Sequence, residues 1–190
     1  MFDLEQFVAD CRTCTSASGS PEPVAELVTR AVFTHAAVIE ALGVPKRAAL
    51  EKLYCSHDLT ILNVVWAPGM TIMPHNHGMW AVIGIYAGRE DNIFWQRLAA
   101  NPTGRLEAVT AKALGEKEVL TLERDVIHSV VNPIPRFSGA IHVYGGDFFG
   151  AARSEWDPEF LVEKPMDVAR AVALFEEANS RTIEHRSTGG

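Results

Sequence analysis

The chain has 190 residues, of which 47% are hydrophobic and 22% are charged, a composition typical of a globular protein. Its formal net charge is −7 and it has no basic run, which argues against binding to nucleic acid or to an anionic membrane surface. No apolar run reaches the length of a membrane span, and the acidic N-terminus does not have the features of a signal or transit peptide. We therefore expect a cytoplasmic protein.

Three cysteines are present, Cys11, Cys14 and Cys55. An odd and small number is typical of a reduced protein rather than of a disulfide framework. Cys11 and Cys14 form a C-x-x-C pair, which elsewhere can bind metal or carry out redox chemistry, but no second pair accompanies it. We assign these cysteines no functional role.

The first part of the chain has helical patterning. Apolar residues recur every three or four positions at residues 2–12 and again at 24–42, where Gly43 ends the pattern. A Ser/Gly/Pro-rich stretch at 13–23 separates the two predicted helices and reads as a linker. Residues 46–53 are expected to add a further helical turn or two.

After residue 54 the pattern changes to short strands separated by turn residues. No helical pattern interrupts the strands, so a parallel sheet with crossover helices is not expected. A C-terminal helix is predicted at 166–178, followed by a polar tail at 180–190. The seven predicted strands lie at residues 59–66, 80–86, 92–98, 106–113, 118–122, 126–131 and 137–144.

These elements predict one mainly β domain over residues 1–190. It comprises an N-terminal helical segment (1–54), a β-barrel or sandwich core (55–153) and a C-terminal extension with a helix (154–190). The helices are expected to cover one face of the barrel or a sheet edge.

His75 and His77 lie between two apolar strand-like runs, just after a Pro/Gly turn. In extended chain, residues i and i+2 point to the same face, so the two imidazoles can reach one metal ion at about 2.0–2.2 Å. Pro74 argues against a helix here. Taken alone, the pair could equally be two solvated histidines in a loop.

Two further histidines, His128 and His142, each lie in a short apolar strand. A buried imidazole must find a hydrogen-bond partner or a ligand. Either residue alone is more often a satisfied core histidine. Together with His75 and His77 they favour a metal site.

These residues carry a resemblance to a known family. Gly69-x5-His75-x-His77-x3-Ala81-x6-Gly88 resembles the first metal motif of the cupins, and 125–128 followed by Asn132-Pro133 resembles the second. Within the cupins the chain most resembles the thiol dioxygenases, that is, cysteine dioxygenase and mercaptopropionate dioxygenase. The matching segments read HNHGMWAVIG, HSVVN and IHVYG, within residues 59–153. The resemblance implies a cupin double-stranded β-helix (jelly-roll) barrel.

The resemblance also implies a site. His75, His77 and His128 would bind a mononuclear Fe(II), and His142 and Tyr144 would form a hydrogen-bonded pair beside it. Arg153 falls near an arginine that in the mercaptopropionate enzymes meets the substrate carboxylate. The alternative for Arg153 is a surface side chain paired with Glu155 or Asp157. Four apolar residues, Trp66, Trp80, Phe94 and Phe148, are candidates for keeping the site dry, and we assign Trp80, with Arg153, to substrate binding.

Three positions depart from the family pattern. Ala81 stands where most cupins have a glutamate ligand, which fits the three-histidine sites of the thiol dioxygenases and leaves no cysteine for a crosslink to Tyr144. Ala140 stands where the family has the serine of a serine–histidine–tyrosine relay. The segment at 54–58 lacks the arginine of cysteine dioxygenase, which weakens cysteine itself as the substrate.

The expected function is therefore oxidation of a small carboxylate-bearing thiol by O2 to the sulfinic acid, in a monomer or homodimer. Three neutral imidazoles leave a divalent iron its full charge and open positions, which an anionic thiolate can fill. The same donors also suit Zn, and the chain could carry Zn, Ni or Mn when purified. A cupin isomerase or hydrolase, or a non-catalytic cupin that binds a small ligand, remains open as the alternative.

Overall fold

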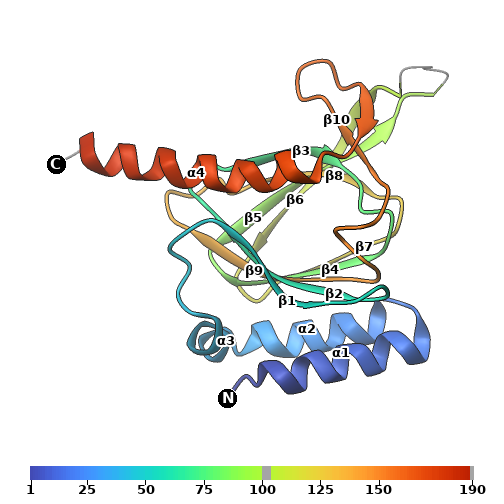
Figure 1. Ribbon diagram of the computed structural model, residues 1–190, viewed down its shortest axis with the longest axis vertical. Coiled ribbons are helices and arrows are strands. Elements are labelled where there is room, and N and C mark those ends of the chain that lie inside the picture. The colour runs from blue at the N-terminus through green and yellow to red at the C-terminus, as the bar shows by residue number, and fades with distance from the viewer. Residues whose placement is uncertain (100–103, 189–190) are drawn as a thin grey trace.

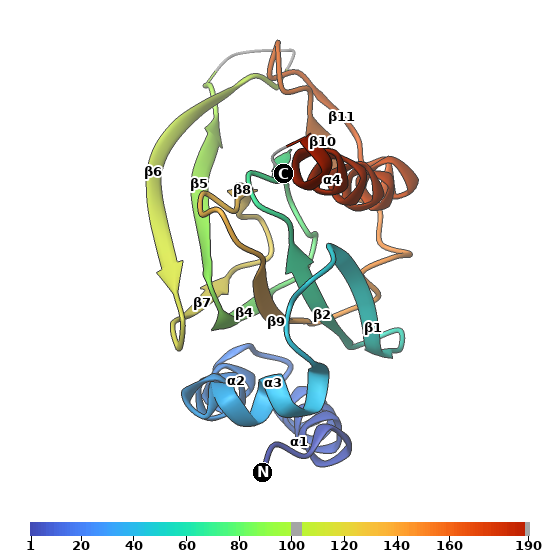
Figure 2. The same cartoon turned by 90° about the vertical axis from the view of Figure 1, so that its left-hand side faces the viewer.

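The computed structural model describes residues 1–99 and 104–188, with side chains up to Thr182. Two antiparallel sheets face each other and enclose the core, with three helices on one side and a fourth on the other (Figures 1 and 2). The apolar side chains between the sheets form one large cluster that includes Leu62, Ile83 and Ile85, each fully buried.

The five-stranded sheet has the order β1-β2-β9-β4-β7 and the six-stranded sheet the order β11-β10-β3-β8-β5-β6. From β2 to β9 the chain changes sheet after every strand except between β5 and β6. This alternation produces a double-stranded β-helix, the cupin-type jelly roll, and the predicted fold class is confirmed. The strands are β1 (Ala49–Cys55), β2 (Thr60–Trp66), β3 (Thr71–His75), β4 (Ala81–Ala87), β5 (Arg89–Arg97), β6 (Leu106–Gly115), β7 (Val119–Leu122), β8 (Ile127–Val131), β9 (Ser138–Tyr144), β10 (Ser154–Trp156) and β11 (Glu163–Pro165).

All seven predicted strands are present, as β2 and β4 to β9. The helical turns predicted at 46–53 are wrong, because this segment forms β1 and pairs with β2 in antiparallel register, with Leu50 opposite Val64. The strand β3 and the three-residue strands β10 and β11 were not predicted. Strands this short do not show a clear alternation of apolar and polar residues.

The N-terminal segment contains three helices, α1 (Leu4–Ser18), α2 (Glu22–Phe33) and α3 (His35–Leu42). The linker predicted at 13–23 is mostly wrong, because α1 continues to a left-handed cap at Gly19 (φ 66°). The single helix predicted at 24–42 is divided at Thr34, whose backbone (φ −98°, ψ 46°) is not helical.

The N-terminal helices cover the outer face of the five-stranded sheet (Figure 2). The helix α2 lies against β4 at Gly84, where an added Cβ would lie 2.4 Å from Val28 Cγ1. The absence of a side chain at Gly84 therefore sets how closely the helix approaches the sheet.

The helix α4 (Val168–Thr188) lies on the opposite side of the molecule from the N-terminal helices (Figure 1). It is longer than the predicted 166–178 and extends through most of the predicted polar tail, of which residues 189–190 lie outside the described chain. Phe175 packs on Trp66 with ring centroids 5.3 Å apart. The Asn179 side chain accepts from the backbone N–H of Ala48 at 2.7 Å and donates to its carbonyl at 3.0 Å.

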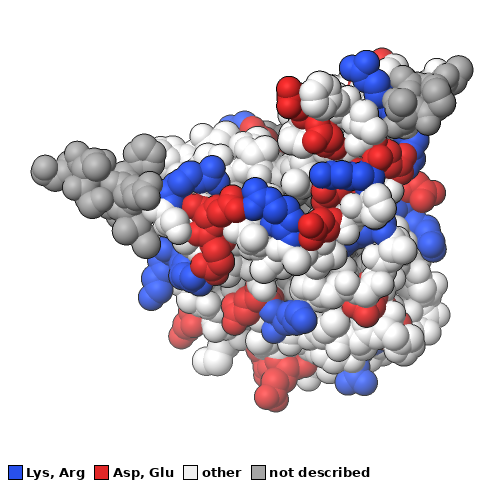
Figure 3. Space-filling model, turned by 45° about the horizontal axis from the view of Figure 1, so that its top comes forward, with Lys and Arg blue, Asp and Glu red and all other residues white. Residues whose placement is uncertain are grey.

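Basic and acidic side chains are interspersed on the molecular face shown in Figure 3. Ion pairs contribute to this pattern, among them Arg47 with Glu176 and Arg170 with Glu177. Within the described residues, none of the helices has the length and apolar character needed to cross a membrane.

Candidate metal centre

The three predicted ligands converge inside the barrel. His75 ends β3 and His128 lies opposite it in the paired strand β8, while His77 follows β3 two residues later. The Nε2 atom of His77 is 3.2 Å from that of His75 and 3.3 Å from that of His128. Donors bound about 2.1 Å from one ion are separated by about 3.0 Å at octahedral and about 3.4 Å at tetrahedral angles. The observed spacings therefore fit a shared metal ion.

Hydrogen bonds fix which ring nitrogen is available in two of these histidines. His75 Nδ1 lies 3.0 Å from the carbonyl oxygen of Met73, and His128 Nδ1 lies 2.7 Å from Asn92 Oδ1. A carbonyl oxygen can only accept, so both Nδ1 atoms donate and both Nε2 atoms keep their lone pairs. Lone pairs that face one another in a buried site repel, and a cation between them removes this cost.

The three imidazoles are neutral near pH 7. Burial lowers the pKa of His75 to about 4. Burial is also the main reason why the pKa values of His77 and His128 lie well below the usual range, and the neighbouring histidines lower them further. Since a metal ion competes with protons for the same lone pairs, these neutral rings are ready to bind one. No other cluster of metal-ligating side chains occurs among the described residues.

His142 and Tyr144 form the expected pair on β9. The Tyr144 hydroxyl is 2.9 Å from His142 Nδ1, and the Tyr144 ring packs edge-on against His77 at 5.0 Å between centroids. Burial raises the pKa of the Tyr144 hydroxyl above its usual value, so this group keeps its proton near neutral pH. Ala81 lies opposite Tyr144 in the β4–β9 ladder and is fully buried, so no carboxylate ligand comes from that position.

Arg153 is only 9% exposed, so it is not the surface arginine of the alternative interpretation. Its Cζ lies 3.9 Å from the ring centroid of Phe148, whose ring is in turn 4.4 Å from that of Tyr144. Neither Nε nor Nη1 of Arg153 has a hydrogen-bond partner in the part of the chain that the structure describes. Burial lowers the pKa of the guanidinium, as expected for a charge removed from water.

A cavity of about 50 Å³ adjoins the cluster. Trp66 and Phe148 line it, as expected for residues that exclude water, whereas Phe94 and Trp80 do not. The Trp80 indole turns outward and donates to the carbonyl of Gly19 at 3.1 Å, so the structure does not bring it to the other predicted site residues. The lining consists of Leu50, Val64, Trp66, Ile72, His75, His77, His128, Val130, His142, Tyr144, Phe148, Met166 and Ala171.

Two buried polar residues beside the site were missed from the sequence. Glu90 and Asn92 lie on β5, are both fully buried, and are joined by a 3.2 Å hydrogen bond from Asn92 Nδ2 to Glu90 Oε1. The residues after Gly88 carry turn-forming side chains, so the strand was expected to begin only at residue 92. It begins at Arg89, and alternation along the strand then directs both polar side chains to the interior. An acid and an amide two residues apart beside an apolar run were the available signal.

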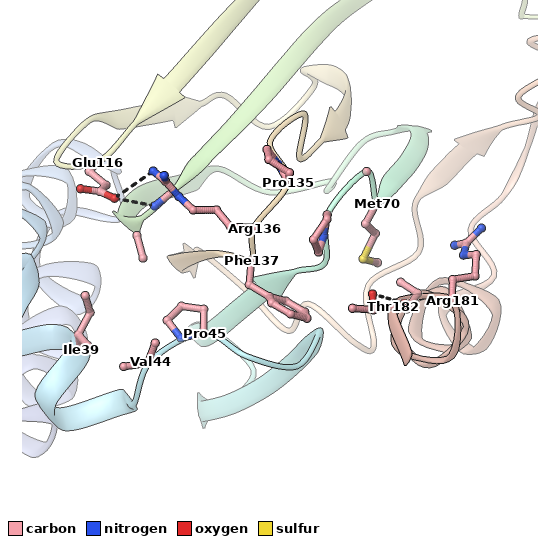
Figure 4. A pocket seen from close by; sticks show the side chains of 15 residues that line it. Ile39, Val44, Pro45, Met70, Glu116, Pro135, Arg136, Phe137, Arg181 and Thr182 are labelled. Carbon is pink, nitrogen blue, oxygen red and sulfur yellow. Dashed lines mark hydrogen bonds and ion pairs between the residues drawn. The ribbon is translucent and has the colours of Figure 1, made fainter. Parts of the chain in front are cut away.

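A second, larger hollow of about 790 Å³ contains none of these residues (Figure 4). Met70, Phe137 and Val44 give it apolar walls. Arg136 at its rim pairs with Glu116 at 3.8 Å. The histidine cluster and Tyr144 line only the smaller of these two cavities.

No protein-family model matches the chain. Among solved structures, it is similar to a cupin-family protein with a double-stranded β-helix fold from Methanocaldococcus jannaschii (TM-score 0.45, 13% identity, 56% of this chain and 85% of that one). It is also similar to an uncharacterized conserved protein with a double-stranded β-helix domain from Klebsiella pneumoniae (TM-score 0.43, 12% identity, 59% of this chain and 81% of that one). A third similarity is to oxalate decarboxylase from Bacillus subtilis (TM-score 0.38, 17% identity, 50% of this chain and 22% of that one). Function has to be argued from the residues of this chain itself.

Proposed function

We propose that this protein is a mononuclear, non-haem Fe(II)-dependent thiol dioxygenase. Its reaction would be RSH + O2 → RSO2H, with R a small group that carries a carboxylate. The observation that carries the proposal is the arrangement around one small cavity. Three neutral imidazoles, Tyr144 and Phe148 line it, and the Phe148 ring contacts the guanidinium of Arg153, whose buried Nε and Nη1 have no partner among the described residues.

His75, His77 and His128 would hold the iron. Bound there, Fe(II) supplies the redox-active centre at which a thiolate and O2 meet. Neutral imidazoles add no negative charge to the site, so an anionic sulfur is a better additional ligand here than in a site that already contains a carboxylate ligand. The donor set thus favours a thiol substrate.

Arg153 would bind the substrate carboxylate. Two buried guanidinium nitrogens without partners are costly unless a ligand supplies an anion, and the planar fork of the group matches a carboxylate in bidentate geometry. The ring of Phe148 contacts both the guanidinium and the Tyr144 ring, so Arg153 lies close to the cavity although it does not line it. A cavity of about 50 Å³ restricts the substrate to a few heavy atoms.

Tyr144 would hold a proton at the edge of the cavity. Its hydroxyl keeps this proton at neutral pH because burial raises its pKa, and His142 fixes its position at 2.9 Å. In the free protein this proton faces His142 Nδ1, and rotation about the C–O bond would direct it to negative charge that develops on oxygen or sulfur. Trp66, Ile72 and Met166 complete an apolar lining that excludes bulk water.

The test is O2 uptake after anaerobic loading with Fe(II), with the bound metal quantified. The panel of thiols is mercaptopropionate, cysteine, cysteamine and mercaptosuccinate. We expect uptake to match sulfinate formation for a carboxylate-bearing thiol and to disappear in His128→Ala. The control His57→Ala, at a side chain that is 93% exposed, should behave as the unmodified protein.

Stoichiometric iron without thiol-dependent O2 uptake would refute the proposal for these substrates. Retention of Zn, Ni or Mn in preference to iron would then favour a cupin isomerase or hydrolase, since three imidazoles also suit zinc. Metal binding without turnover of any substrate would favour a ligand-binding role.

A further inference from the structure

Glu90 joins two chains of polar contacts that lead to different parts of the site. Its carboxylate is 0% exposed. Oε2 accepts from Trp66 Nε1 at 2.9 Å and Oε1 accepts from Asn92 Nδ2 at 3.2 Å. His142 Nε2 lies 3.5 Å from Oε2. One chain therefore runs through Asn92 to His128, and the other through His142 to Tyr144.

The hydrogen bonds give the first chain its direction. Both Glu90 oxygens accept, from Trp66 Nε1 and from Asn92 Nδ2, so the Asn92 amide directs its NH2 group to Glu90 and its Oδ1 to His128. His128 Nδ1, at 2.7 Å from that oxygen, must then carry the proton. The lone pair of His128 consequently stays on Nε2, the atom that faces His77.

The second chain is directed in the same way. At 3.5 Å the contact between His142 Nε2 and Glu90 is electrostatic rather than a hydrogen bond, and Nε2 has no hydrogen-bond partner among the residues described. The carboxylate favours a proton on that nitrogen. In the neutral ring, Nδ1 is then free to accept from the Tyr144 hydroxyl at 2.9 Å.

We infer that Glu90 is a positioning residue that sets the donor–acceptor direction of both chains. Through Asn92 it presents the His128 lone pair to a divalent metal ion, and through His142 it orients the Tyr144 hydroxyl. The metal part of this inference requires only a metal site, whereas the Tyr144 part rests on the proposed function. Ala140 has no hydroxyl that could contact His142, unlike the serine of the family at this position. The carboxylate of Glu90, on β5, contacts His142 instead.

The test uses one variant that reverses the hydrogen-bond direction from Glu90 through Asn92 to His128, and a second variant that restores it. In Glu90→Gln, the carboxamide has one acceptor oxygen. If this oxygen stays with Trp66, its NH2 group faces Asn92, whose amide must turn. The Asn92 NH2 group then faces His128 Nδ1 and forces the His128 proton onto Nε2, where the metal binds. In the double variant Glu90→Gln/Asn92→Asp, the new aspartate accepts from both neighbours, and the original direction returns with the net charge unchanged.

Zinc affinity, measured by competition with a chromophoric chelator, is the first readout. Second-sphere substitutions commonly weaken metal binding 10- to 100-fold. We therefore expect Glu90→Gln to weaken zinc binding about 10-fold or more, and the double variant to return within about threefold of the original. Unchanged affinity in Glu90→Gln, or a double variant no better than the single one, would overturn the inference.

The second readout needs no variant. Two-bond 1H–15N NMR of the zinc-loaded protein should show His128 protonated at Nδ1 and His142 protonated at Nε2. A neutral His142 protonated at Nδ1 would overturn the inference even if the Glu90 variants failed to fold. Neither readout depends on thiol turnover, so failure of the dioxygenase proposal and failure of this inference are separate results.

Discussion

Replacement of Arg153 by methionine is expected to change stability and substrate binding in opposite directions. In the free protein, Nε and Nη1 are buried without partners, and each such donor costs about 1–3 kcal/mol. Methionine removes this cost and keeps an apolar stem and a sulfur against Phe148. We expect the metal-free variant to be more stable by at least about 1 kcal/mol, or roughly 2–4 °C in Tm.

The same substitution removes the group that is proposed to bind the substrate carboxylate. Hydrogen bonds to charged partners are worth about 1.5–3 kcal/mol each. Loss of two of them, about 3 kcal/mol, lowers kcat/KM roughly 100-fold. The assay compares mercaptopropionate with propanethiol, which lacks the carboxylate and should show little change. Arg153→Lys, which keeps the charge without the bidentate fork, should be intermediate.

An equal loss for both thiols would refute the assignment of Arg153 to the carboxylate, because it would mean that the substitution damages the site in general. A lower Tm in the metal-free variant would refute the argument from unpaired donors.

Three further predictions concern the site and its support. Metal-free protein should lose stability as pH falls from 6.5 to about 4, because burial lowers the pKa of His75 to about 4 whereas the unfolded chain takes up this proton near 6.5. The loss in the free energy of unfolding reaches roughly 3 kcal/mol. A free energy of unfolding, measured with urea, that stays constant over this pH range would contradict this prediction. Tyr144→Phe should keep zinc affinity within about twofold but lower kcat about 10-fold or more. Equal losses of both would contradict the assigned role. Gly84→Ala places a Cβ 2.4 Å from Val28 Cγ1 and should cost about 1–3 kcal/mol in thermal unfolding. Gly115→Ala, which meets only a flexible side chain at 3.5 Å, is its control.

The fold could be predicted where a segment is long enough to show its period. The seven strands from β2 to β9 other than β3 alternate or run apolar over four or more residues. β1 was misassigned because Ala49, Leu50, Glu51 and Lys52 favour helices, and only pairing with β2 overrides that preference. The division of the helix at Thr34 was not predicted, because the apolar period continues across it.

The site could be predicted where chemistry is local in sequence. The spacing of His75 and His77 allows a ligand pair, the strand histidines His128 and His142 favour it, and the structure brings His128 to the pair across the β3–β8 ladder. Glu90 could not be found in this way, because its role depends on Trp66 and His142, which come from two strands of the other sheet. Trp80 does not line the cavity, and sequence proximity to the histidines could not indicate to which side its ring turns.

The division of the site between the two sheets has a consequence for how such a protein can change over evolutionary time. His75 and His128 belong to the six-stranded sheet, whereas His142 and Tyr144 belong to the five-stranded one. Under the proposed function, substitutions in β9 can therefore change the reaction while metal binding is inherited intact. Glu90 is the exception, because it contacts partners in both sheets. It is therefore the position at which the two properties can be lost together.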